Sequence, residues 1–181
     1  MLQLYTGSGK GKTTAAAGLA VRAAGRGIPV LFAQVMKDGS SGEISVLRHL
    51  PGVTVLIMDT FLGFSFRMNE EERTAAAASI RRVLSGACAW AGGLPEPPDP
   101  EKAEVRGVLI LDEALSAVRT GLIEEAELIR FTDRIPEELE VVMTGRGSFP
   151  LLEERAEYVS YIECRKHPYL KGTPARRGIE Y

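Results

Sequence analysis

The sequence has few of the residues from which enzymes usually build a nucleophile, a general base or a disulfide framework. Its 181 residues include two cysteines and two histidines. Cys88 and Cys164 are far apart and show no metal-binding or redox spacing, so we expect reduced thiols that pack inside a cytosolic protein. No serine stands in a nucleophile elbow, and only His49 and His167 are candidate general bases at neutral pH. Nothing in the sequence therefore points to catalysis by a side-chain nucleophile.

The chain also lacks an excess of positive charge and a long apolar run. Its formal net charge is −2 at pH 7, whereas a general nucleic-acid binder normally carries a basic excess for its phosphate contacts. No apolar segment approaches the length of a membrane span, and a glycine-rich loop begins too early to leave room for a secretory signal. We therefore expect a cytoplasmic protein with no nucleic-acid and no membrane partner. At this length a single domain, residues 1–181, is expected.

Short apolar segments alternate with helical ones along the chain. This pattern is typical of a mostly parallel sheet with helices on both faces, and it predicts the α/β class. Several of the apolar segments are too uniformly apolar to have one face in water. The predicted strands are residues 2–5, 30–36, 53–58, 108–111, 141–144 and 159–162.

Two long helices are predicted between these strands. Residues 13–26 are rich in alanine and other helix formers, and the glycines that follow can end the helix. Asn69 followed by Glu72 is the signature of a capping box, and it predicts a helix that runs to about Trp90. The proline-rich residues 92–100 are expected to form an exposed loop, which is too short to separate two domains.

Residues 6–14, Thr-Gly-Ser-Gly-Lys-Gly-Lys-Thr-Thr, form a phosphate-binding loop that is one residue shorter than usual. The usual form, G-x-x-x-x-G-K-[ST], has four residues between its outer glycines, whereas Ser8, Gly9 and Lys10 are the only residues between Gly7 and Gly11. Thr6 stands where the missing glycine would be. The shortened loop argues against ordinary ATP hydrolysis.

The residue types in this loop favour a bound polyphosphate. The glycines let backbone N–H groups turn toward an anion, Lys12 can reach phosphate oxygens, and the Thr13 hydroxyl can ligate Mg²⁺. A glycine-rich turn without a ligand is the alternative, but such a turn has no use for two lysines. The residues predicted to bind nucleotide are Gly7, Ser8, Gly9, Lys10, Gly11, Lys12, Thr13 and Thr14.

An apolar strand that ends in Asp112 and Glu113 resembles a Walker B element. Such a strand delivers an acid to its carboxyl edge, where the ligands of open α/β sheets bind, so we predict that Thr13, Asp112 and Glu113 hold Mg²⁺ or Mn²⁺. Acids at this place can also cap the next helix and favour its dipole. In a hydrolase, Glu113 would instead polarise the attacking water.

Two further cations fall at the same predicted edge. Lys37 follows the second strand and Arg146 follows the fifth, and both are predicted to meet the nucleotide, with a solvated surface charge as the alternative. The basic segment 165–181 can be disordered, but Tyr169 and Ile179 favour a segment folded back on the body.

The motifs, taken in order, resemble the P-loop family of ATP:corrinoid adenosyltransferases. The resemblance spans nearly the whole chain, and the short glycine loop is the form that this family has. It rests on residues 6–14, Gly42-Glu43, Leu111-Asp112-Glu113, Thr144-Gly145-Arg146 and the C-terminal motif Lys166-His167-Pro168-Tyr169-x-x-Gly172-x-x-Ala175-Arg176-x-Gly178-Ile179-Glu180-Tyr181.

This resemblance implies a P-loop NTPase-like, RecA-like fold and a defined reaction. Family members transfer the 5′-deoxyadenosyl group of ATP to the Co(I) of a reduced corrinoid and release triphosphate, in coenzyme B12 synthesis or corrinoid salvage. It also implies a Mg²⁺-dependent cytoplasmic homodimer served by an electron-donor protein such as a flavodoxin-like reductant. Co(I) is a nucleophile with no proton to lose, so the scarcity of general bases agrees with this chemistry.

The resemblance assigns catalytic roles to Lys12, Phe64 and Phe66. Lys12 would stabilise the leaving triphosphate. In the family a Gly-Phe-Thr-Trp stretch supplies aromatics that displace the lower ligand of cobalt; here Phe64 matches and Phe66 stands in place of tryptophan. Without the resemblance, the two phenylalanines are more typical of a core. The alternatives to a transferase are a P-loop ATPase or small-molecule kinase, which would split the β–γ bond, and a regulatory module that binds nucleotide or corrinoid without turnover.

Overall fold

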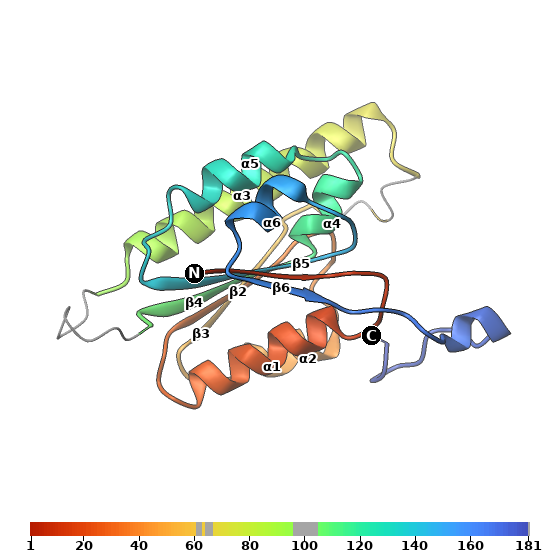
Figure 1. The fold of residues 1–181 in the computed structure, drawn as a ribbon, viewed down its shortest axis with the longest axis horizontal. Helices are drawn as coiled ribbons and strands as arrows, with labels where there is room; N and C mark the ends of the chain where they lie inside the picture. Colours follow the sequence, from red (N-terminus) through yellow and green to blue (C-terminus); the bar gives the residue numbers. More distant parts are fainter. Residues whose placement is uncertain (61–62, 64–66, 96–104, 181) are drawn as a thin grey trace.

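A sheet of six strands forms the centre of the computed structural model, which describes residues 1–60, 63, 67–95 and 105–180. The order across the sheet is β3-β2-β4-β5-β1-β6, and every neighbouring pair runs parallel (Figure 1). The predicted α/β class and parallel sheet are therefore confirmed. The strands are β1 (Leu2–Thr6), β2 (Val30–Gln34), β3 (Val53–Ile57), β4 (Gly107–Asp112), β5 (Leu139–Thr144) and β6 (Tyr158–Tyr161).

The strand β5 lies between β1 and β4, and this arrangement positions the site. Tyr5 of β1 is level with Thr144 of β5, and Leu111 of β4 is level with Met143. Because the strands are parallel, the ends of all three meet at one edge of the sheet. The loop that follows β1 and the acids at the end of β4 therefore flank Thr144 from its two sides.

Helices cover both faces of the sheet, as predicted. In Figure 1, α1 and α2 lie on one face and the remaining α-helices lie on the other. No helix in the described part of the chain is both long enough and apolar enough to cross a membrane. The helices are α1 (Lys12–Ala24), α2 (Gly42–Leu47), α3 (Glu70–Gly92), α4 (Ala114–Arg119), α5 (Glu125–Thr132), α6 (Pro150–Arg155) and the 3₁₀ helix η2 (Pro168–Lys171).

Two apolar clusters hold these layers together. On one face, the alanines of α1 allow close approach to the sheet, where Ala16 and Ala20 pack with Phe32 and Val142. On the other face, α3 and α4 pack on Leu109 and its neighbours. The strands β2 and β4 are buried along their whole length, because helices cover both of their faces. In the strand β6, by contrast, all residues are exposed at the edge of the sheet.

The predicted capping box begins α3. The amide of Glu72 donates to the Asn69 side chain at 2.9 Å, and the Asn69 amide donates to the Glu72 carboxylate at 2.8 Å. The helix ends at Gly92, so the prediction that the loop starts at this residue is wrong by one position. Residues 96–100 of that predicted loop lie outside the described residues.

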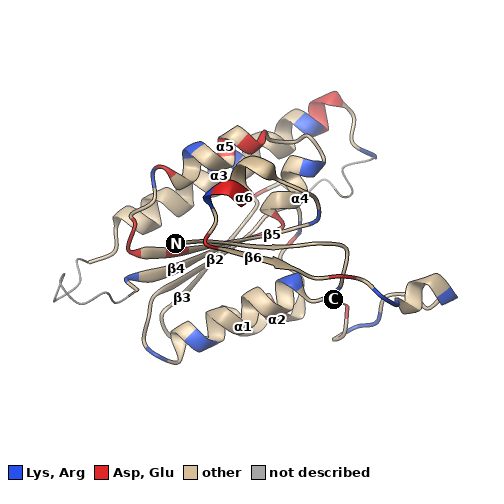
Figure 2. Ribbon diagram, viewed as in Figure 1, with Lys and Arg blue, Asp and Glu red and all other residues tan. Residues whose placement is uncertain are grey.

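The C-terminal segment stands away from the sheet beside the end of β6 (Figure 1). It carries several of the basic side chains near the carboxyl edge of the sheet (Figure 2). It contains η2 and a turn in which Arg176 pairs with Glu180. Tyr169 and Ile179 are 74% and 54% exposed. The expectation that they pack on the body is therefore wrong, because the segment folds mainly on itself.

Candidate functional site

The glycine-rich loop connects β1 directly to α1, so the free N–H groups at the start of α1 face it. Gly7 and Gly11 have positive φ angles of 100° and 118°. Gly11 is the N-cap of α1, and Lys12 is the first residue of the helix. A left-handed glycine therefore precedes the helix N-terminus, an arrangement that can direct backbone N–H groups toward an anion.

The same loop packs tightly on the residue that follows β6. The amide of Gly9 donates to the carbonyl oxygen of Ile162 at 2.7 Å. A Cβ atom on Gly7 would lie 2.5 Å from that oxygen, and one on Gly9 would lie 2.8 Å from it. These two glycines are thus required by a contact between distant segments, which the spacing of the motif does not reveal.

The Lys12 side chain closes the loop from inside. Only 6% of Lys12 is exposed, and its Nζ donates to the carbonyl oxygens of Gly7 at 2.9 Å and Gly9 at 2.6 Å. Burial and the nearby charge of Arg146 lower the pKa of Lys12, although Glu113 and Asp112 act in the opposite direction. The ammonium is held where an anion bound by the loop would replace the carbonyl groups as its partner.

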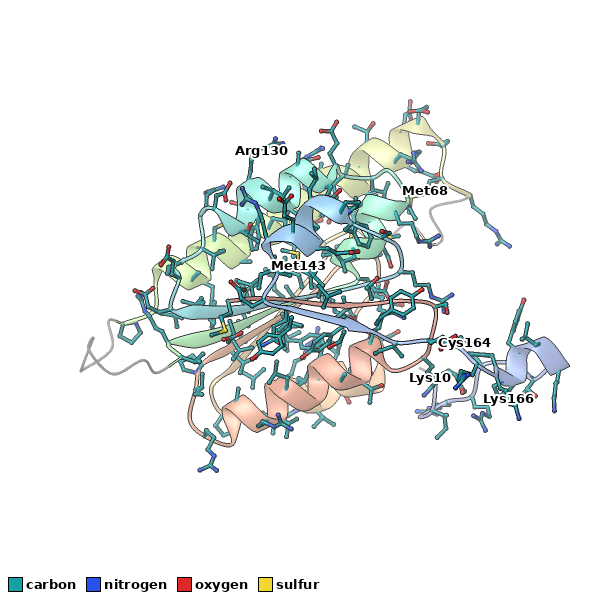
Figure 3. The ribbon with its side chains drawn as sticks, in the orientation of Figure 1. Lys10, Met68, Arg130, Met143, Cys164 and Lys166 are labelled. Carbon is teal, nitrogen blue, oxygen red and sulfur yellow. The ribbon has the colours of Figure 1, made fainter. Side chains whose placement is uncertain are left out.

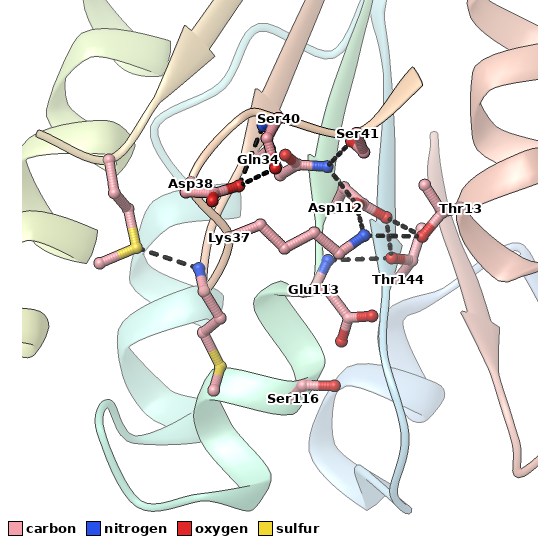
Figure 4. Close-up of polar contacts among 12 residues, drawn as sticks. Thr13, Gln34, Lys37, Asp38, Ser40, Ser41, Asp112, Glu113, Ser116 and Thr144 are labelled. Carbon is pink, nitrogen blue, oxygen red and sulfur yellow. Dashed lines mark hydrogen bonds and ion pairs between the residues drawn. The ribbon is translucent and has the colours of Figure 1, made fainter. Parts of the chain in front are cut away.

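Asp112 is the centre of a buried polar network at the end of β4 (Figure 4). Its Oδ1 accepts hydrogen bonds from the hydroxyls of Thr13 at 2.8 Å and Thr144 at 2.7 Å. The two hydroxyls come from the start of α1 and the end of β5. The strand order therefore brings the loop threonine and the predicted metal-binding acid into direct contact.

The second oxygen of Asp112, Oδ2, accepts hydrogen bonds from two nitrogen donors, one at the end of β2 and one three residues after it. Lys37 Nζ lies 2.8 Å from Oδ2, and Gln34 Nε2 lies 3.2 Å from it. Burial acts against the charge of Lys37, but the attraction and hydrogen bond of Asp112 outweigh it and raise the lysine pKa. Lys37 was predicted to meet the nucleotide; its partner in this structure is the carboxylate of Asp112, and the contact with nucleotide stays a prediction.

Glu113 takes a different position from Asp112. Its backbone lies in the left-handed region at φ 64° and ψ 12°, and its amide donates to Thr144 Oγ1 at 2.9 Å. The carboxylate points away from the network around Asp112 (Figure 4). A left-handed conformation is strained for a glutamate, and such strain is concentrated at functional sites. The two acids therefore have separate environments.

Arg146 reaches the same edge of the sheet through a tight turn. A Cβ atom on the preceding residue, Gly145, would lie 2.4 Å from the amide nitrogen of Ser116. The Arg146 amide donates to Ser116 Oγ at 3.2 Å. The exposed Arg146 side chain acts electrostatically on Lys12, so its charge is available to an anion in the loop.

Lys10 faces the C-terminal segment, where Figure 3 shows it near Cys164 and Lys166. Together they line a hollow of about 280 Å³. The Cys164 amide also donates to Ser8 Oγ at 3.3 Å. The segment that leads into the C-terminal motif is thereby attached to the phosphate-binding loop.

The oxygen atoms around Asp112 suit a magnesium ion. A hydroxyl, a carboxylate and substrate phosphates are the donors that Mg²⁺ commonly takes in nucleotide sites. Gln34 Oε1 is buried beside Asp112 and has no hydrogen-bond partner among the described residues, which leaves one acceptor unused in the network. The described residues contain no cluster of three metal-binding side chains, so phosphate oxygens would have to complete such a site.

Comparison with known proteins agrees with this geometry. A family model described as ATP:corrinoid adenosyltransferase BtuR/CobO/CobP matches residues 1–181. The chain belongs to this family. It is therefore an enzyme of the adenosyltransferase class with a P-loop NTPase-like fold.

Curated relatives within the adenosyltransferase class match over nearly the whole chain. The corrinoid adenosyltransferase of Pseudomonas aeruginosa is 30% identical, with 100% of this chain and 83% of the relative covered. The corrinoid adenosyltransferase CobA of Salmonella typhimurium is 33% identical, with 98% and 84% covered. The corresponding protein of Escherichia coli K12 is 31% identical over the same shares.

The structure brings together most of the residues that the motifs predicted. Thr13, Asp112 and Lys37 form one contact network, and Lys12 precedes Thr13 at the start of α1 with its ammonium bound to Gly7 and Gly9. Phe64 and Phe66 lie outside the described residues, so their roles stay predictions.

Two members of the network were not predicted to be site residues. Gln34 is the polar residue in an otherwise apolar predicted strand, and that contrast was the available signal. The sequence marks Thr144 only as the end of a strand, because its contact with Asp112 depends on β5 lying between β1 and β4.

Proposed function

We propose that this adenosyltransferase moves the 5′-deoxyadenosyl group of ATP to the Co(I) of a reduced corrinoid and releases intact triphosphate. The observation that carries the proposal is the convergence of the buried Lys12 ammonium and the Thr13–Asp112 pair at the N-terminus of α1. Such a constellation binds a polyphosphate. The family supplies the adenosyl acceptor class, the corrinoid.

In this reaction the loop stabilises a leaving group. Cobalt supplies the electron pair for a new bond to C5′, the C5′–O bond breaks, and its electron pair leaves with the triphosphate. Lys12 would exchange the carbonyl oxygens of Gly7 and Gly9 for phosphate oxygens, and the helix N-terminus would add its N–H groups. Arg146 would neutralise further charge at the open side of the loop.

A magnesium ion would be held by Thr13 and Asp112, and Mn²⁺ is the proposed substitute. When bound, the metal supplies positive charge to the triphosphate oxygens. Asp112 holds the Thr13 hydroxyl in place at 2.8 Å, so the loop is oriented toward this edge before nucleotide arrives. Glu113 has a separate position and is proposed to assist the metal site through water.

The reaction needs no general base, because Co(I) carries no proton. The protein must align cobalt with C5′ and exclude competing water. We propose that Phe64 and Phe66 lie beneath the corrinoid, where they displace the lower ligand of cobalt and exclude water. We also propose a cytoplasmic homodimer that receives its electron from a protein donor such as a flavodoxin-like reductant.

The test is product analysis with ATP and chemically reduced cobalamin. The proposal predicts a light-sensitive adenosylated corrinoid together with triphosphate. If the protein instead produced ADP and phosphate, it would act as an ATPase or kinase. In an ATPase, Glu113 would polarise the attacking water.

A further inference from the structure

We propose that Lys37 is a built-in counter-cation, which occupies the place of the metal ion between Thr13 and Asp112 until metal and nucleotide arrive together. The proposal rests on the metal site of the proposed function, and it adds a regulatory step to that site. It states that the ATP-free protein excludes Mg²⁺ because its own ammonium group is already bound there.

The position of the ammonium is the first argument. Lys37 Nζ lies 3.2 Å from Thr13 Oγ1 and 2.8 Å from Asp112 Oδ2 (Figure 4). These side chains are the hydroxyl and the carboxylate that would ligate the metal. A divalent cation bound to them at about 2.0–2.1 Å would stand next to a second positive charge. The two cations therefore compete for the same oxygen atoms.

The burial of Asp112 explains why a substitute cation is needed. The Asp112 side chain has no exposed surface, and a buried carboxylate without a counter-charge is strongly destabilising. The hydroxyls of Thr13 and Thr144 and the amide of Gln34 satisfy its hydrogen bonds, but they carry no charge. Lys37 is the cation in direct contact with this carboxylate.

The surroundings of Lys37 are consistent with release of its ammonium group from Asp112. Its side chain is 30% exposed while that of Asp112 is fully buried, so the lysine, unlike the carboxylate, is in contact with solvent. Lys37 lies in the connection between β2 and α2, directly after Met36, whose backbone is left-handed at φ 57°. On this proposal the ammonium releases Asp112 and turns toward the phosphates of the incoming nucleotide. In that position it would add to the charge that Lys12 provides.

The experiment compares wild type with Lys37→Met by calorimetric titration of MgCl₂ and by thermal unfolding, both without ATP. The proposal predicts weak Mg²⁺ binding and little change of Tm with Mg²⁺ for wild type. For Lys37→Met it predicts a lower Tm without metal, recovery of Tm with Mg²⁺, and Mg²⁺ affinity higher by about tenfold or more, since the metal no longer displaces a charged hydrogen bond.

Matched variants keep the test decisive. Lys37→Gln removes the charge but keeps a hydrogen-bond donor, so it replaces Lys37→Met if that variant does not fold. Lys171→Met removes an exposed lysine of η2 and should behave as wild type. The proposal is overturned if Lys37→Met or Lys37→Gln binds Mg²⁺ no more tightly than wild type does.

The outcomes also separate this inference from the proposed function. Unchanged Mg²⁺ affinity in the variants, together with Mg²⁺-dependent triphosphate release by wild type, would remove the role of Lys37 and leave the reaction intact. A wild-type enzyme whose turnover and ATP binding are both indifferent to Mg²⁺ would remove the metal site itself.

Discussion

The Thr13 hydroxyl donates a 2.8 Å hydrogen bond to Oδ1 of Asp112, a residue that lies 99 positions further along the chain. This bond joins the phosphate-binding loop to the acid at the end of β4. The hydroxyl of Thr144, at the end of β5, donates to the same oxygen at 2.7 Å. The strand order therefore assembles the site. A substitution of Thr13, Asp112 or Thr144 should alter the hydrogen bonds of the other two residues.

Replacement of Lys12 by alanine should nearly abolish turnover. The ammonium is the buried cation of the loop, and removal of one such electrostatic contact to a developing charge typically costs about 10²–10³ in rate. Lys10→Ala is the matched control, because Lys10 faces the C-terminal segment, and it should lose less. Steady-state rates of corrinoid adenosylation measure both, and a Lys12→Ala enzyme within a few-fold of wild type would refute the assigned role.

Asp112→Asn should damage both folding and Mg²⁺-dependent ATP binding. The four described groups that contact the carboxylate all donate to it, so either orientation of the new amide directs its own NH₂ group at donors. An unsatisfied buried polar group costs about 1–3 kcal/mol, which urea unfolding can measure.

Glu113→Gln is the companion variant and should separate the two acids. Its side chain points away from the Asp112 network, so its stability should stay close to that of wild type. If Glu113 assists the metal, ATP affinity in Mg²⁺ should fall modestly. If it were a water-activating base, ATP binding would be normal and only hydrolysis would be lost. Titration calorimetry with ATP and Mg²⁺ distinguishes the two roles.

Elements with strong local signals were predictable from the sequence. The capping box at Asn69 and the alanine-rich α1 follow from short-range preferences, and both are confirmed. The apolar runs of β2 and β4 also predicted strands that are buried on both faces.

Features that depend on tertiary arrangement were not predictable in this way. Spacing alone says nothing of the contact between Gly9 and Ile162, because it depends on β6 pairing with β1. The binding of Lys37 to Asp112 likewise depends on β2 and β4 being neighbours. Tyr169 and Ile179 were expected to be covered because they are apolar, but no other described element packs over them enough to bury them.

Gly7→Ala should be more harmful than Gly11→Ala, although both glycines have positive φ angles. A Cβ atom at Gly7 would meet Ile162 O at 2.5 Å, whereas one at Gly11 would meet nothing within 4 Å. Gly11→Ala should thus cost only the backbone strain, about 1–2 kcal/mol. Gly7→Ala should lose more stability in urea unfolding and should also weaken ATP binding. Equal losses would contradict the role of the contact with Ile162.

Phe64→Ala should impair the corrinoid half of the reaction and leave ATP binding unchanged. An apolar wedge that displaces the lower ligand makes cobalt easier to reduce, so its benefit should disappear when preformed Co(I) is supplied. The variant should lose most activity with a biological reductant and retain much more with chemically generated Co(I). Its folding must be checked first, since aromatic truncation in a core costs about 3–5 kcal/mol. Equal losses in both assays would place Phe64 in the general scaffold.

The most direct test of the account is a single turnover with ATP that carries separate labels on the adenosine and on the γ-phosphate, in the presence of Mg²⁺ and preformed Co(I) cobalamin. The account predicts one adenosyl label bound to cobalt for each labelled triphosphate released, with no label in ADP or in early inorganic phosphate. Release of labelled phosphate and ADP without a cobalt–carbon bond would contradict the central claim that the loop holds a triphosphate leaving group.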